Sequence, residues 1–218
     1  MHTATPDALL AQLHWRYATK KFDSSKKIPA ATWQAIEESS ALAPSSYGLQ
    51  PWKFVTVADP ELRTKLQAMS FKQPQIVDAS HVVVFARKAE VTVADVDVFV
   101  ARIVAVRGGT AEALKGYRDM MASAVSNPDT LPGESMDTYT RAQTYIALGF
   151  ALYTAAQLGV DACPMEGIEA PKYDEALGLT ALGYKASCVA TFGYRSSEDA
   201  TGKLAKVCFA HESLFIRK

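Results

Sequence analysis

Positively charged side chains are concentrated in two segments that lie far apart in the sequence. Residues 16–27 contain five basic residues and a single acidic one, Asp23. The basic residues of the two segments are Arg16, Lys20, Lys21, Lys26 and Lys27 in the first and Lys203, Lys206, Arg217 and Lys218 in the second. If the segments converge, they form an anion site, because the planar fork of an arginine suits a phosphate group. On spacing alone, a solvated charged surface is the simpler interpretation.

Other sequence patterns that carry chemistry are absent. The chain has no G-x-G-x-x-G after a predicted strand, no G-x-x-x-x-G-K-[ST], no H-E-x-x-H and no G-x-S-x-G. Its four histidines and three cysteines lack the spacing of metal ligands or of a disulfide framework. We therefore expect no metal, no nucleophilic triad and no Rossmann dinucleotide site, and we interpret His81 as a structural residue.

Composition predicts an ordered domain without a strong surface charge. The chain has 218 residues, 49% of them apolar, and its 23 basic residues balance its 23 acidic ones. A chain of this length and apolar content buries a substantial core, and zero net charge argues against nucleic acids and membrane surfaces as partners. The first residues lack the pattern of a secretory signal peptide. We expect a cytoplasmic protein.

Hydrophobic periodicity predicts one α+β domain over residues 1–218. The expected helices are 6–14, 30–43, 59–69, 92–105, 110–124, 137–158 and 171–177, and the expected strands are 53–57, 81–86, 161–167 and 186–192. Residues 142–160 carry no charge, but their polar side chains favour a helix buried at a subunit interface over a membrane span. Residues 106–137 read as a helical excursion or lid. The tail 204–218 has no clear period, yet its apolar side chains need a place to be buried.

Five segments, in matching order, resemble motifs of the FMN-dependent nitroreductase family. They are Trp15–Asp23 (family pattern R-x-S-x-R/K-x-F), Ala43–Trp52 (A-P-S-S-x-N-x-Q-P-W), Asp78–Phe85 (the central strand), Cys163–Gly167 (P-x-E-G) and Lys206–Cys208 (K-x-R). Each motif is weak alone, but their shared order is specific. The sequence is most similar to the oxygen-insensitive NAD(P)H nitroreductases and the members that resemble dihydropteridine reductase.

The resemblance implies a nitroreductase-like α+β fold with a small central mixed sheet surrounded by helices. It also implies an intertwined homodimer that binds FMN between its subunits. The helix at 137–158 would form much of the interface, and the tail 204–218 would lie on the partner subunit. Both expectations agree with the independent interpretation of these two segments.

The resemblance also assigns candidate cofactor-binding residues. Those near the phosphate and ribityl chain would be Arg16, Tyr17, Ala18, Lys206 and Cys208. Those near the flavin ring would be Lys20, Lys72, Gln75, Gln143, Pro164, Met165, Glu166 and Gly167, with a backbone N–H of Glu166 or Gly167 near N5. Pro44, Ser45 and Ser46 would come from the partner subunit. No side chain would be catalytic, since the flavin carries the electrons, but Lys20 and Glu166 would tune it. Tyr47, Met120 and Met121 would line the acceptor pocket.

Three residues depart from the family patterns. Ala18 replaces a serine, Gly48 replaces an asparagine, and Cys208 replaces an arginine. The last change removes a bidentate phosphate ligand. We therefore expect weaker FMN retention than in typical members, unless Lys203 or Arg195 takes over the missing contact.

These expectations lead to one main hypothesis and two alternatives. The main hypothesis is an FMN-dependent NAD(P)H oxidoreductase that reduces nitroaromatics, quinones or similar flat acceptors by alternating hydride transfer. The first alternative is a dihydropteridine reductase or a dehalogenase-like reductase on the same scaffold. The second is a flavin-binding or flavin-storage protein without catalytic activity.

Overall fold

A four-stranded antiparallel sheet forms the centre of the molecule. The computed structural model describes residues 4–131, 133 and 135–218. The strands are β1 (Trp52–Thr56), β2 (His81–Lys88), β3 (Asp161–Met165) and β4 (Tyr184–Gly193), in the order β1-β2-β4-β3. Every neighbouring pair is antiparallel, so the expectation of a mixed sheet is wrong. The parallel contact that the structure describes is a single bridge between Ala18 and Ala162, beside the edge strand β3.

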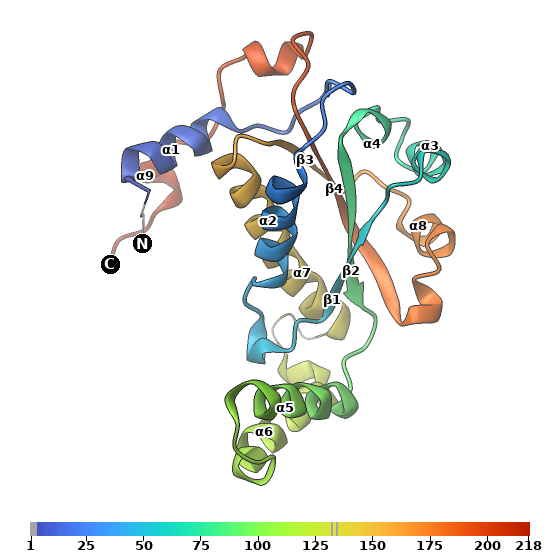
Figure 1. The fold of residues 1–218 in the computed structure, drawn as a ribbon. Coiled ribbons are helices and arrows are strands. Elements are labelled where there is room, and N and C mark those ends of the chain that lie inside the picture. Colours follow the sequence, from blue (N-terminus) through green and yellow to red (C-terminus); the bar gives the residue numbers. More distant parts are fainter. Residues whose placement is uncertain (1–3, 132, 134) are drawn as a thin grey trace.

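Helices cover both faces of this sheet (Figure 1). One face packs against α2 (Ala30–Ala41) and α7 (Met136–Gln157), and its core contains Trp33, Phe85 and Phe192. The other face packs against α3 (Pro60–Ala68), α4 (Gln75–Asp78) and α8 (Ala170–Ala176), around a core that includes Leu66, Ile76 and Tyr173. This double cover explains why residues 82–86 of β2 form an unbroken apolar run and why residues 186–193 of β4 are buried, since both faces of these strands are covered.

Local sequence sets where the main helices begin. In α1 (Pro6–Trp15), Thr5 caps the first turn through its hydroxyl and Pro6 occupies a position that needs no donor. Asp59 caps α3 in the same way, and its carboxylate accepts the N–H of Glu61 at 3.0 Å. The predicted boundaries of the long helices therefore lie within a few residues of the observed ones, whereas the four-residue helix α4 was not predicted.

A separate helix pair projects from one end of the sheet. It consists of α5 (Val93–Arg107) and α6 (Lys115–Ser126), which pack on each other and on the first turn of α7 around Val96, Met121 and Tyr139 (Figure 1). The predicted excursion began at residue 106, but α5 also belongs to the projecting unit. Tyr117 of α6 donates to the carbonyl oxygen of Tyr47 at 2.9 Å, so the pair supports the loop 44–50.

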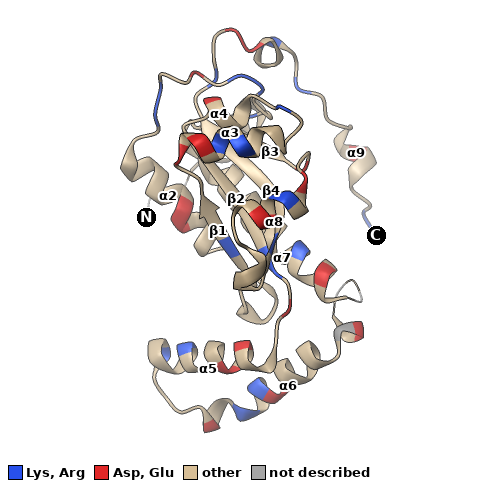
Figure 2. Ribbon diagram, turned by 90° about the vertical axis from the view of Figure 1, so that its right-hand side faces the viewer, with Lys and Arg blue, Asp and Glu red and all other residues tan. Residues whose placement is uncertain are grey.

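The last fifteen residues extend away from the body of the molecule (Figure 2). They contain one short helix, α9 (His211–Leu214), and their apolar side chains are largely exposed: Val207 by 93%, Phe209 by 82% and Ile216 by 87%. One chain alone therefore leaves the tail's apolar surface uncovered.

The uncharged stretch at 142–160 forms most of α7. Among the residues that the structure describes, no helix is long and apolar enough to cross a membrane. Polar side chains of α7, among them Thr140, Gln143 and Thr144, are instead buried against the rest of the chain.

Candidate cofactor site

Asp199 fixes the backbone of the first basic segment. Its side chain is 4% exposed. Its Oδ2 accepts the backbone N–H of Lys20 at 2.8 Å, that of Lys21 at 3.0 Å and the hydroxyl of Tyr17 at 3.0 Å. Burial raises the pKa of Asp199, but these donors outweigh it and hold the pKa below the usual range for a carboxyl. The charged carboxylate thus locks residues 17–21 and leaves the Lys20 side chain exposed to solvent.

A second buried carboxylate, Asp161, holds Arg195. The Arg195 Nε donates to Asp161 Oδ1 at 2.7 Å, and its backbone N–H donates to Oδ2 at 2.8 Å. The guanidinium lies 4.2 Å from the ring centroid of Trp15 and 4.5 Å from that of Tyr17. Arg195 is thus engaged by Asp161, Trp15 and Tyr17, and its contact with a phosphate in place of the arginine missing at Cys208 stays a prediction.

The two basic segments meet at the end of α1. The ammonium of Lys206 donates to the carbonyl oxygens of Leu13 and Arg16, each at 2.6 Å. Burial and the charge of Arg16 hold the pKa of Lys206 below its usual value. Arg16, Lys20 and Lys206 form no ion pair with any carboxylate in the described part of the chain. The result is a concentration of positive charge without a counter-ion, and Cys208 lies exposed two residues beyond it.

Gln75 and Cys163 adjoin this basic cluster. The Nε2 of Gln75 lies 3.9 Å from Cys163 Sγ. Burial raises the pKa of the Cys163 thiol, and the charges of Lys20 and Arg16 oppose this rise. The preceding residue, Ala162, pairs with Ala18 and accepts the backbone N–H of Thr19 at 3.2 Å, so β3 adjoins the segment that carries both cations. The Oε1 of Gln75 is buried and receives no hydrogen bond from the described residues. A buried acceptor without a donor costs about 1–3 kcal/mol, so this atom is suited to a ligand that supplies the donor.

The segment Pro164–Gly167 leaves β3 and is fixed from two sides. Gln73 donates from Nε2 to the Gly167 carbonyl oxygen at 3.1 Å, and the Tyr145 hydroxyl of α7 donates to the Glu166 carboxylate. Burial and this hydrogen bond raise the pKa of Tyr145. The backbone of residues 164–167 is therefore held in place, while the Glu166 side chain remains exposed.

A second group of predicted site residues lies around the loop 44–50. The backbone N–H of Ser46 donates to Gln143 Oε1 at 2.8 Å, and the Tyr139 hydroxyl donates to the Ser46 carbonyl oxygen at 3.3 Å. Ser45 Oγ accepts the backbone N–H of Gln50 at 2.8 Å. Pro44, Ser45, Ser46 and Gln143 thus form one unit with the N-terminal half of α7.

The loop 44–50 and the end of α1 lie at opposite ends of α7 (Figure 1), whereas Glu166 contacts Tyr145 of α7, two residues from Gln143. Ala18 pairs with Ala162, just after α7 ends at Gln157, whereas Gln143 lies fourteen residues earlier on that helix. At 1.5 Å per residue, the separation along α7 is about 21 Å. Within one chain, the loop 44–50 therefore does not meet Arg16 and Lys206.

Backbone strain is concentrated in the loops of both groups. Among the described residues other than glycine, Tyr47, Gln50, Phe71 and Lys72 have positive φ, at 59°, 46°, 52° and 57°. Such conformations are costly for side chains of this size and cluster at functional loops. Sequence reasoning missed Phe71 and the strain itself, because the residues that usually signal this conformation, Gly and Asn, are absent at these positions.

The three predicted acceptor-pocket residues differ in their surroundings. Met121 is completely buried between α5, α6 and α7, so its assignment to an acceptor pocket is wrong and it is a core residue. Met120 is 49% exposed on α6, and Tyr47 is half-buried in the strained loop. Tyr117, which joins this loop to α6, was missed in the sequence.

His81 has a structural environment. Its ring stacks on Trp33 with the centroids 4.0 Å apart, and its Nδ1 lies 3.0 Å from Ser80 Oγ. The described residues contain no group of three or more His, Cys, Asp or Glu side chains that could hold a metal ion.

Comparison with known proteins identifies relatives along almost the whole chain. The sequence model of the nitroreductase family matches residues 13–194. A protein of Staphylococcus epidermidis, provisionally named an NAD(P)H nitroreductase, is 37% identical over 211 residues, which cover 90% of this chain and 91% of the relative. A Bacillus subtilis protein with the same provisional name is 36% identical and covers 86% of this chain and 88% of its own length.

Solved structures share the fold at lower sequence identity. A nitroreductase-type protein of Bacillus subtilis superposes with a TM-score of 0.84 at 19% identity, covering 98% of this chain and all of the other. A protein from Exiguobacterium sibiricum, crystallised in complex with FMN, has a TM-score of 0.81 at 19% identity and covers 100% of this chain and 99% of the other.

Proposed function

The chain belongs to the nitroreductase family and is an oxidoreductase, and from this premise we propose that it binds FMN and transfers hydride from NAD(P)H to flat acceptors such as nitroaromatics and quinones. The names of the relatives and the FMN complex of a structural neighbour support the cofactor and the electron donor. The observation that carries the proposal is the unneutralised cluster of Arg16, Lys20 and Lys206 beside the unpaired Gln75 oxygen.

The residues of this cluster fit the chemical groups of FMN. Arg16 and Lys206 supply positive charge for a phosphate, and the chain places no carboxylate against them within its described part. The free Oε1 of Gln75 accepts a ring N–H, and the exposed ammonium of Lys20 suits the electron-rich edge of a flavin. Pro164–Gly167 offer a fixed backbone with N–H groups next to these side chains.

The protein positions the cofactor and tunes its charge. FMN, when bound, supplies the chemistry of accepting a hydride from a reduced nicotinamide and passing electrons to a second substrate. Asp199 holds the backbone of Lys20, and the Lys20 ammonium would add positive charge that favours an anionic reduced cofactor. Tyr145 and Gln73 keep residues 164–167 from moving. No side chain has to act as a base, which agrees with the absence of a catalytic triad.

The complete site requires two copies of the chain. The loop 44–50 and Gln143 of one copy would join Arg16, Lys20 and Lys206 of the other, because the two groups lie about 21 Å apart along α7 in one chain. Ile146, Phe150 and Tyr153 follow the i, i+4, i+7 spacing of one helix face, and each is about 40% exposed on α7. This apolar stripe supports α7 as a dimer contact.

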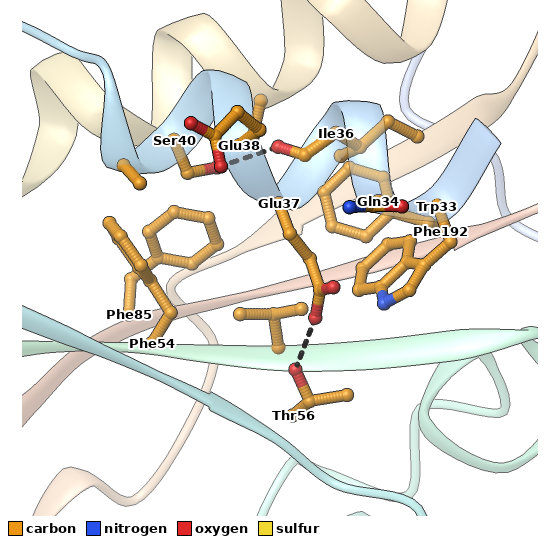
Figure 3. Close-up of a pocket in the computed structure, with 13 residues that line it drawn as sticks. Trp33, Gln34, Ile36, Glu37, Glu38, Ser40, Phe54, Thr56, Phe85 and Phe192 are labelled. Carbon is orange, nitrogen blue, oxygen red and sulfur yellow. Dashed lines mark hydrogen bonds between the residues drawn. The ribbon is translucent and has the colours of Figure 1, made fainter. Parts of the chain in front are cut away.

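The exposed tail supports the same assembly. A groove of about 330 Å³ lies between α2 and the sheet, next to the edge strand β1, and Trp33, Phe54 and Phe85 line it (Figure 3). Glu37 and Glu38 of α2 add negative charge to its lining. The tail offers the complementary pattern, apolar residues 214–216 followed by basic residues 217–218. The tail of a second copy would bury its apolar side chains there.

The visible spectrum of the purified protein tests the proposed function. We expect flavin absorbance that bleaches on anaerobic addition of NADH or NADPH and returns with a quinone or a nitroaromatic. A colourless protein that does not bind added FMN would refute the proposal. Bound FMN without NAD(P)H oxidation would instead indicate flavin storage. Turnover of a quinonoid pterin or iodotyrosine, without turnover of nitroaromatics, would indicate the alternative reductase functions.

A further inference from the structure

A second pocket lies on the side of α4 that faces away from Gln75. It measures about 330 Å³ and is enclosed by the end of β1, the start of α3 and the connection from α4 to β2. Val77 lines it, and because Val77 and Gln75 are two residues apart on a helix, they point to roughly opposite sides. The pocket is therefore distinct from the candidate cofactor site.

Arg63 contributes a buried positive charge to this pocket. Arg63 is 8% exposed. Nε, Nη1 and Nη2 each donate to a backbone carbonyl oxygen, of Val57 at 2.8 Å, Ala79 at 2.7 Å and Ser80 at 3.0 Å. A guanidinium has five N–H groups, so these bonds leave two of them available. Within the described residues no carboxylate pairs with Arg63, although a buried charge is costly without a counter-ion.

His81 adds a neutral donor. Ser80 Oγ accepts the backbone N–H of Ile28 at 2.9 Å, so its own proton can go to His81 Nδ1 at 3.0 Å. This arrangement is compatible with the neutral tautomer that carries its hydrogen on Nε2. Burial, together with the charges of Arg63 and Lys27, lowers the pKa of His81 to about 4, so the ring stays neutral near pH 7.

The lining of the pocket has cations and apolar walls but no acid. Lys27 completes the polar part, and Val57, Ala58 and Val77 form the apolar part. Two nearby carboxylates accept hydrogen bonds: Glu37 accepts from Oγ1 of the lining residue Thr56 at 3.4 Å, and Asp59 accepts the N–H of Glu61 at 3.0 Å. The volume exceeds that of a free oxyanion, and the apolar walls suit an attached organic group.

We propose that this pocket binds a phosphate monoester, with its phosphate on Arg63, Lys27 and His81 Nε2 and its organic part against Val57, Ala58 and Val77. The buried guanidinium gains the counter-ion that the chain itself does not supply. A ligand against Val57, Ala58 and Val77 contacts both the segment after β1 and α4, and α4 also carries Gln75. The proposal does not depend on FMN binding elsewhere in the molecule.

Calorimetric titration with phenyl phosphate tests the pocket, with inorganic phosphate and phenol as reference ligands at constant ionic strength. The protein is first loaded with FMN and the unbound FMN is removed, because free FMN is itself a phosphate monoester and would compete for the pocket. We expect saturable binding of phenyl phosphate and about tenfold weaker binding in Lys27→Gln, the size of one charge-assisted hydrogen bond. Lys26→Gln is the matched control, because Lys26 directly precedes Lys27 in the sequence and its ammonium pairs with the Asp23 carboxylate at 3.1 Å. Its affinity should equal that of the wild type.

Removal of Arg63 is not used as the main test, since that variant would also lose three bonds to backbone carbonyls. Ala58→Asp is the second variant, and it should abolish binding by placing a negative charge in the lining. Equal affinities of the wild type and Lys27→Gln for phenyl phosphate would overturn the proposal. Binding that does not saturate would also overturn it, as would a loss of affinity in Lys206→Gln equal to that in Lys27→Gln. If inorganic phosphate bound and phenyl phosphate did not, the proposal of a phosphate monoester would be overturned, and the ligand would be a free oxyanion.

Discussion

At the scale of single residues, two buried carboxylates position the basic cluster. Asp199 holds residues 17–21, and Asp161 holds Arg195 between Trp15 and Tyr17. The motif Trp15–Asp23 could be recognised in the sequence, but its supports could not, because they lie about 180 residues further along the chain. Sequence reasoning therefore predicted that Arg16 and Lys206 converge, but not that Asp161 and two aromatic rings hold Arg195.

Replacement of Asp199 should lower the stability of the protein and make that stability less dependent on pH. Asp199→Asn should lower the free energy of unfolding at pH 7 by about 2–3 kcal/mol, because several donors lose a charged acceptor. The pKa of Asp199 is lower in the folded protein than in the unfolded chain, where it is near 3.9. The charged carboxylate therefore stabilises the fold fully above the unfolded-state pKa, and this contribution is lost as the pH falls through the folded-state pKa. Urea unfolding between pH 7 and pH 2 measures this. Glu90→Gln, at an exposed site, should match the wild type, and an Asp199→Asn protein as acid-sensitive as the wild type would contradict the assignment.

The ammonium of Lys20 should set the reduction potential of bound FMN. Lys20→Ala removes a positive charge whose backbone Asp199 holds in place, so the potential should fall and reduction by NAD(P)H should slow. Lys21→Ala is the matched control, because the Lys21 ammonium pairs with Glu198 on the surface. A spectroelectrochemical titration gives both potentials. An unchanged potential in Lys20→Ala would remove Lys20 from this role.

Cys208 occupies the position where the family pattern has an arginine, which we expect to be a phosphate ligand. Cys208→Arg should bind FMN about tenfold more tightly, because a charged hydrogen bond contributes about 1.5–3 kcal/mol and Arg195 is already paired with Asp161. Flavin fluorescence quenching gives the affinity. Cys208→Ser controls for the loss of the thiol. Equal affinities in all three proteins would show that the phosphate is held without help from this position.

At the scale of elements, the loop 44–50 depends on the projecting helix pair. The apolar periodicity predicted α6 and α7, but not that α5 joins the projecting unit, since helix packing depends on contacts between segments far apart in sequence. The same contacts explain why a glycine occupies position 48, where the family pattern has an asparagine. Its φ is 82°, and a β-carbon at this position would lie 2.7 Å from the Phe99 ring of α5.

Gly48→Ala should therefore destabilise the protein by about 1–2 kcal/mol, through left-handed backbone and contact with Phe99. Phe99→Leu in the same chain should restore the stability lost through the contact with the Phe99 ring. The loss that comes from the left-handed backbone should remain. Thermal unfolding of the single and double variants separates the two. If Gly48→Ala were as stable as the wild type, the close approach of α5 to the loop would be wrong.

At the scale of the whole molecule, the proposed sharing of the site between two copies of the chain leads to a test by subunit mixing. Arg16→Gln disables one group of site residues, and Gln143→Leu disables the other by removing the acceptor of the Ser46 N–H. In a dimer whose sites are shared, each mixed dimer contains one site with both groups intact. Random exchange between equal amounts makes half of the dimers mixed, so about a quarter of the wild-type sites should return.

Flavin absorbance and NAD(P)H oxidation would both measure this recovery after the two inactive variants are mixed and allowed to exchange subunits. Phe150→Glu, introduced into both variants, should abolish the recovery, because it places a charge in the exposed apolar stripe of α7. Without that change, a mixture that stays as inactive as its components after proven exchange would mean that each chain builds its own site. The separation along α7 would then have to be closed by movement within one chain, which the buried contacts of Gln143 and Tyr139 with Ser46 oppose.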